Sequence, residues 1–86
     1  MSKLRYEATD STGRVWKRTT THRVYSHAVV IFLREYQDRF RPELTWPAEQ
    51  RAEWAGRPDL AENVARRYRN GRHVEHVEVL EARRVT

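Results

Sequence analysis

The sequence lacks cysteine entirely, which excludes a disulfide framework and a thiolate zinc site. Its longest apolar run, Ala28 to Leu33, is far shorter than the roughly 20 residues that a membrane-spanning helix needs. The first five residues also lack the apolar centre of a secretory signal. These absences predict a cytoplasmic protein that does not contact a membrane.

Lysine is scarce as well, because fifteen of the seventeen basic residues are arginine. The net charge is +5 and the calculated pI is about 10.2. Arginine presents a planar fork of donors that suits phosphate and carboxylate groups and that stacks on flat rings. The charge favours nucleic acid or an acidic protein surface as the partner and does not choose between them. A GC-rich genome would explain the excess of arginine equally well.

At 86 residues the chain is expected to form one domain, residues 1–86. Leu4, Tyr6 and Ala8 alternate with polar residues, which predicts a half-buried strand. A turn over residues 10–13 and a return strand over residues 14–25 would complete a β-hairpin. A four-residue loop would turn Val15 towards the core and Trp16 outwards, and a three-residue loop would reverse this. The sequence leaves the register open.

The middle of the chain supports two interpretations. Residues 26–40 carry apolar side chains at helical spacing, but residues 27–32 form a continuous, partly β-branched run that is typical of a central strand. We favour a strand to about residue 34. Pro42 and Pro47 then predict a loop, and the residues from Ala48 to Ala55 favour a short helix.

A helix is predicted from Pro58 to Asn70, with Gly71 in the left-handed conformation that often follows a helix. Its apolar stripe consists of Leu60, Ala61, Val64, Ala65 and Tyr68. A last strand is predicted over residues 74–83. The fold class is therefore α+β: a small antiparallel sheet, including an N-terminal hairpin, with one main helix packed on one face.

Two segments resemble a group of small uncharacterised proteins encoded by actinobacterial phages and mobile elements. They are Arg23-Val24-Tyr25-Ser26-His27-Ala28-Val29-Val30 and Glu53-Trp54-Ala55-Gly56-Arg57-Pro58-Asp59-Leu60-Ala61. The resemblance implies a strand after a hairpin for the first segment and a strand end turning into a helix for the second. It implies an origin in a phage or mobile element, and an actinobacterial host, but almost nothing about activity.

No motif for catalysis or for a cofactor stands out. Ser26 and His27 are adjacent, and neighbouring side chains on a strand point to opposite faces, so we expect no nucleophile–base pair. His73 and His76 diverge on the predicted strand, so no metal site is expected. The glycines do not form a phosphate-binding loop. The sequence predicts a non-enzymatic protein without a cofactor.

Binding surfaces remain, and the charge is distributed unevenly among them. Residues 1–41 carry a net charge of +5, residues 42–65 a net −3 and residues 66–86 a net +3. The candidates for binding DNA or RNA are Arg14, Trp16, Lys17, Arg18 and Arg23 on the hairpin and Arg66, Arg67, Arg69 and Arg72 at the helix end. The alternative is an effector that binds a host protein through Trp46, Glu43 and Glu49. Either function is compatible with a monomer or a homodimer.

Overall fold

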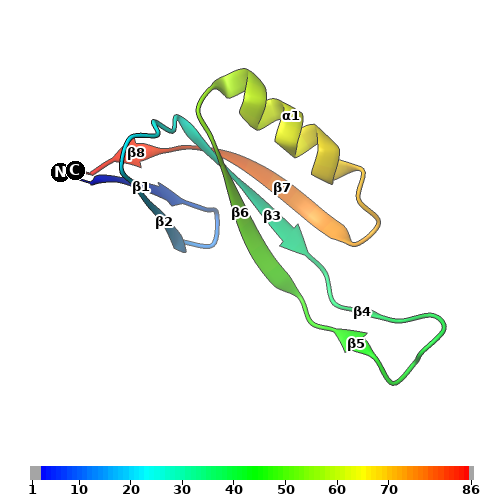
Figure 1. Cartoon of the computed structure of the whole chain (residues 1–86). Coiled ribbons are helices and arrows are strands. Elements are labelled where there is room, and N and C mark those ends of the chain that lie inside the picture. The colour runs from blue at the N-terminus through cyan, green and yellow to red at the C-terminus, as the bar shows by residue number, and fades with distance from the viewer. Residues whose placement is uncertain (1–2, 86) are drawn as a thin grey trace.

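The computed structural model describes residues 3–85, which form two three-stranded antiparallel sheets, a two-stranded pair and a helix. The elements, in chain order, are β1 (Leu4–Thr9), β2 (Val15–Thr20), β3 (His27–Leu33), β4 (Tyr36–Gln37), β5 (Thr45–Trp46), β6 (Glu49–Ala55), α1 (Pro58–Arg69), β7 (Val74–Glu81) and β8 (Arg83–Arg84). Figure 1 shows α1 lying along the sheet and the hairpin β1–β2 at one end of the molecule. The predicted α+β class is confirmed.

Strand β3 is the centre of the main sheet, whose order is β6-β3-β7. Successive residues of a strand point to opposite faces, so Val29 and Ile31 lie on one face and Ala28 and Val30 on the other. All four are completely buried. A strand covered on both faces needs apolar residues at every position, which explains the continuous run. The favoured strand interpretation of this segment is confirmed for His27–Leu33.

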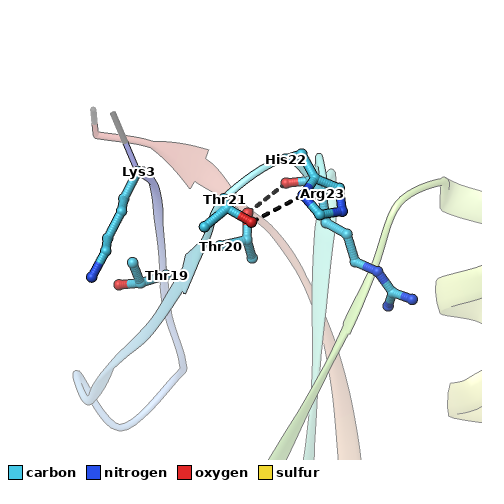
Figure 2. Close-up of a pocket in the computed structure, with 6 residues that line it drawn as sticks. All are labelled: Lys3, Thr19, Thr20, Thr21, His22 and Arg23. Carbon is cyan, nitrogen blue, oxygen red and sulfur yellow. Dashed lines mark hydrogen bonds between the residues drawn. The ribbon is translucent and has the colours of Figure 1, made fainter. Parts of the chain in front are cut away.

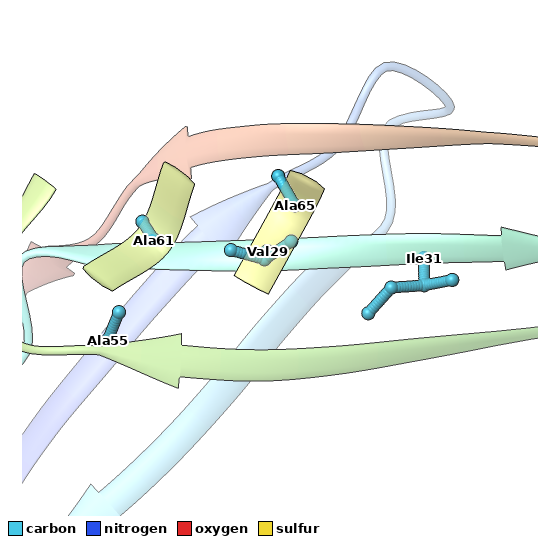
Figure 3. Close-up of a cluster of buried hydrophobic side chains, with 5 residues drawn as sticks. All are labelled: Val29, Ile31, Ala55, Ala61 and Ala65. Atoms are coloured by element: carbon cyan, nitrogen blue, oxygen red, sulfur yellow. The ribbon is translucent and has the colours of Figure 1, made fainter. Parts of the chain in front are cut away.

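Helix α1 covers the face of the sheet that carries Val29 and Ile31. Ala61 and Ala65 pack against these two side chains together with Ala55 (Figure 3). Both β6 and β7 run antiparallel to β3 and are therefore parallel to each other, and α1 connects them across β3. The small alanine side chains allow the helix backbone to approach the sheet closely.

The two ends of α1 differ in how well the sequence predicted them. The helix begins at Pro58 as expected. Leu60, however, was assigned to the apolar stripe, and its side chain is 41% exposed. Gly71 does not have a positive φ, so the predicted left-handed conformation is wrong; within residues 3–85 only Gly13 has one. A Cβ at Gly71 would lie 2.7 Å from Cγ2 of Val74. Close approach of the loop to β7 is therefore what requires glycine there.

The hairpin has the register of the three-residue loop. Asp10 and Arg14 flank that loop, with the Asp10 N–H donating to the Arg14 carbonyl over 3.0 Å, and Gly13 has a φ of +90°. Ala8 therefore pairs with Trp16, and both side chains face the rest of the protein. Val15 points outwards and is 44% exposed. The register that the sequence left open is decided by the turn.

The hairpin sheet, of order β2-β1-β8, packs on the face of β3 that is opposite the helix. The Tyr6 ring meets Tyr25 edge to face, with ring centroids 5.7 Å apart, and Tyr25 lies 6.0 Å from Trp54 of β6. At the turn, the Ser11 N–H donates to Glu78 of β7 over 2.9 Å. The predicted last strand is present but divides at Ala82, where the chain passes from the main sheet into the hairpin sheet.

Two predictions for the middle of the chain are wrong. The segment expected to be a short helix is β6, because Glu49–Ala55 pairs with β3 over its whole length. The expected loop contains β5, which pairs with β4. Residues 34–48 thus form a two-stranded extension of the sheet, here called the arm, which projects from the body in Figure 1. The molecule is elongated, with extents of 50 × 24 × 22 Å.

Candidate nucleic-acid interface

The predicted basic patch on the hairpin is divided between two faces. Arg18 pairs with Tyr6 and lies on the same face of the hairpin as that buried ring, although Arg18 itself is exposed, whereas Lys17 pairs with Glu7 on the opposite face. The guanidinium of Arg14 lies 3.8 Å from the centre of the Trp16 ring. Trp16 is half-buried and is already covered on one face by Arg14, so it does not present the free stacking surface of the outward alternative.

Arginines from the hairpin and from the helix meet at the edge of β6. Arg18 and Arg67 line a hollow of about 360 Å³ together with Tyr25, Trp54, Ala52, Glu53 and Val64. We call this hollow the β6-edge groove. Its two arginines belong to the two separate basic patches of the sequence, and the aromatic rings of Tyr25 and Trp54 line the same hollow. The acidic segment also contributes, because Glu53 accepts a hydrogen bond from the Tyr68 hydroxyl over 3.2 Å.

Positive charge is concentrated around the hydroxyl of Tyr25. Burial raises the pKa of this phenol, but the hydrogen bonds and charges of Arg23 and Arg18 outweigh burial and hold the pKa below its ordinary value of 10.0. Two guanidinium groups therefore approach one oxygen atom at the hairpin side of the β6-edge groove. Two positive charges therefore lie near this side of the groove, where they favour an anionic ligand.

The four predicted arginines at the helix end do not form one cluster. Arg69 makes an ion pair with Glu62, with 2.6 Å between Nη1 and Oε1. Arg66 is exposed, and Arg67 lines the β6-edge groove. Arg72 lies beyond the helix and lines another hollow, of about 330 Å³, with Arg39 of the arm. The structure thus divides this patch between the groove and the base of the arm.

A hollow of about 480 Å³ lies at the connection between β2 and β3 and is drawn in Figure 2. The Thr20 hydroxyl donates to the Arg23 carbonyl over 2.8 Å, and the Thr21 hydroxyl lies 2.9 Å from Nδ1 of His22. These local contacts occupy the polar groups of the loop. Figure 2 shows the Lys3 and Arg23 side chains pointing away from each other, so they do not converge on a common ligand.

The base of the arm carries a cluster that the sequence did not reveal. The Tyr36 and His73 rings stack, with centroids 3.6 Å apart and planes inclined by 7°, and Trp46 lies 6.2 Å from Tyr36 on the neighbouring strand. We call these three rings the arm platform. Tyr36 and His73 are far apart in the sequence, and only the approach of the loop after α1 to the arm brings them together. No periodic pattern could have identified this pair.

The predicted protein-interface residues all lie on or beside the arm. Trp46 is 50% exposed, and Glu43 is exposed near the arm tip. Glu49 pairs with Arg51, with 2.6 Å between Oε1 and Nη2. Trp46, Glu49 and Arg51 line a hollow of about 390 Å³ beside the arm platform. Glu43 does not reach this hollow, so the three interface candidates do not form one site.

The expectation that Ser26 and His27 point to opposite faces and cannot interact is wrong. Ser26 Oγ lies 2.8 Å from Nδ1 of His27, because Ser26 precedes β3 and its side chain is free to turn towards the ring. Within residues 3–85, no carboxylate hydrogen-bonds the His27 ring to orient it as a base.

In the same range, no group of three or more His, Asp or Glu side chains is arranged to hold a metal ion. Nor is α1, the helix of this range, long and apolar enough to cross a membrane.

Comparison with known proteins gives no relative from which a role could be taken. No family model matches the chain, and neither a curated protein nor a solved structure matches it.

Proposed function

We propose that this chain is a nucleic-acid-binding accessory protein of a phage or mobile element, and that the β6-edge groove contacts the phosphate backbone. The observation that carries the proposal is the position of Arg18 and Arg67 on the same hollow. The origin rests on the resemblance of the two sequence segments alone. Contacts from arginine to phosphate supply most of the sequence-independent affinity of nucleic-acid-binding proteins.

Several features of the groove support this function. Arg23 and Arg18 hold positive charge at the Tyr25 hydroxyl on the hairpin side, and Arg67 adds charge from the helix side. No acidic side chain forms an ion pair with Arg18 or Arg67 within the described residues, so no carboxylate neutralises these two charges directly. Phosphates spaced along a backbone would complement cations on both sides of a groove.

The test is a binding titration of labelled single-stranded and duplex DNA at ~50 to 300 mM salt. We expect affinity to fall steeply with salt, since each phosphate contact adds about 0.9 to the log–log slope for duplex DNA. Arg18→Ala and Arg67→Ala should each weaken binding and reduce this slope by about 0.7–1. Arg57→Ala is the matched control, because Arg57 is exposed and pairs with Asp59 outside the groove. The absence of binding in ~50 mM salt, or a slope unchanged in both groove variants, would contradict the proposal.

The second candidate, binding of a host protein, is supported by the exposed aromatics of the arm. Phe40 is 90% exposed and Trp46 50% exposed, and exposed tryptophan often anchors protein interfaces. Capture from a nuclease-treated host lysate separates the two functions. A stoichiometric partner protein that survives nuclease and is lost in Trp46→Ala would favour this candidate.

A further inference from the structure

Four arginines lie around the flat rings of the arm platform. Arg34 and Arg51 line the hollow on one side of the Tyr36–His73 stack, and Arg39 and Arg72 line the hollow on the other side. Arg34 donates to the Val74 carbonyl over 3.2 Å, which holds its guanidinium near the stack. Of these four arginines, Arg51 alone forms an ion pair with a carboxylate within the described residues.

The platform also offers a surface for stacking. His73 covers Tyr36 at 3.6 Å and so holds that ring in place. Trp46 lies beside Tyr36 and is 50% exposed, which leaves indole surface open to solvent. Rings held next to arginines bind unpaired nucleotides without reading their sequence, since every base has a flat face and every nucleotide of a strand is linked to a phosphate. A duplex does not offer these faces, because its bases are stacked on each other.

Strand β6 connects the arm platform with the β6-edge groove. Arg51 and Glu49 at its start line the hollow beside the platform, and Trp54 near its end lines the groove. The two hollows are adjacent along the strand, because Arg51 lines one and Ala52 the other, and the strand rises about 17 Å from Glu49 to Trp54 at about 3.3 Å per residue. β6 is also an edge strand, with β3 as its neighbour on one side, so its other edge is not paired with a strand within the described residues.

We propose that the arm platform binds unpaired nucleotides of a single strand that runs along β6 from the β6-edge groove. In this arrangement a base stacks on Trp46, while Arg34, Arg39 and Arg72 contact the flanking phosphates. The inference rests on the proposed function and adds a ligand class, single-stranded rather than duplex nucleic acid.

The experiment measures the affinity of the full chain for an oligothymidine of ~20 nucleotides and for a duplex of equal length in ~100 mM salt. We expect the single strand to bind more tightly, and Trp46→Ala to weaken its binding about tenfold, which is the usual effect of losing one stacked base. Trp46→Phe keeps a flat ring and should retain binding to within about threefold. Phe40→Ala is the matched control, because Phe40 is a fully exposed aromatic on the same arm that lines neither hollow.

The failures of the two proposals are distinguishable. If the chain binds nucleic acid with a steep salt dependence but Trp46→Ala leaves single-strand affinity unchanged, the platform inference is overturned and the proposed function stands. Equal weakening by Phe40→Ala and Trp46→Ala would also overturn it, because the arm would then act only through its general apolar character. Preference for the duplex would overturn it as well. If the wild-type chain binds neither nucleic acid, both proposals fail.

Discussion

The indole N–H of Trp16 donates a hydrogen bond to Oδ2 of Asp10 over 2.9 Å, which fastens the return strand of the hairpin to its turn. The other carboxylate oxygen of Asp10 accepts from the Thr12 N–H over 2.8 Å and from the Arg14 N–H over 3.2 Å. Asp10 is 5% exposed and is the buried charged side chain of residues 3–85. One carboxylate therefore organises both the turn and the inward orientation of Trp16.

This arrangement predicts an acid-sensitive hairpin. Hydrogen bonds from the Thr12 hydroxyl and then from Trp16 lower the pKa of Asp10 from 3.8 to about 2. The pKa in the folded state is lower than in the unfolded state, so Asp10 contributes its full stability above pH 3.8 and loses it as the pH falls towards 2. Asp10→Asn removes this titration. Urea unfolding at stepped pH should show a smaller acid loss for the variant than for the wild type; equal losses would contradict the assignment.

Glu78 is predicted to hold the hairpin turn on the main sheet. It accepts from the Ser11 N–H and hydroxyl and lies 3.0 Å from Nε2 of His76. Burial raises the pKa of Glu78, but these hydrogen bonds outweigh it and the pKa lies below its ordinary value. Glu78→Gln should lower the free energy of unfolding at neutral pH by about 1–2 kcal/mol. Glu75→Gln, at an exposed position of the same strand, is the control and should have no effect.

Two tyrosines that touch each other should respond oppositely to removal of the hydroxyl. The Tyr6 hydroxyl is buried without a hydrogen-bond partner in the described residues, whereas the Tyr25 hydroxyl interacts with Arg23 and Arg18. A buried, unsatisfied hydroxyl is unfavourable, so Tyr6→Phe should raise the free energy of unfolding by about 1 kcal/mol. Tyr25→Phe should lower it by a similar amount. Destabilisation by Tyr6→Phe would indicate a partner for that hydroxyl, such as a bound water molecule.

The helix–sheet contact predicts a strict limit on size at Ala65. Its side chain is completely buried against Val29 and Ile31, and a larger residue would force α1 away from β3. Ala65→Leu should therefore lower the free energy of unfolding by about 1–3 kcal/mol. Ala48→Leu adds the same atoms at an exposed position of the arm and serves as the control. Thermal unfolding followed by circular dichroism measures both; equal melting temperatures would contradict the tight packing.

Elements with a strong local pattern could be predicted from the sequence. Strand β1 alternates, β3 is a continuous apolar run, and α1 begins at a proline and repeats with helical period. Strand β6 could not be predicted in this way, because Glu49–Ala55 consists largely of good helix formers. Hydrogen bonding to β3 along its whole length outweighs that preference, and such pairing depends on residues distant in the chain.

The candidate sites, like the fold, could be predicted from the sequence only in part. The sequence by itself determined the excess of arginine, the absence of cysteine chemistry and the strength of the local patterns, since these depend on composition and on near neighbours. Tertiary structure decided that Arg18 and Arg67 line one groove, that Arg14 covers Trp16 and that His73 stacks on Tyr36. Contacts between segments far apart in the chain form only when the whole core closes, and the spacing of residues carries no record of them.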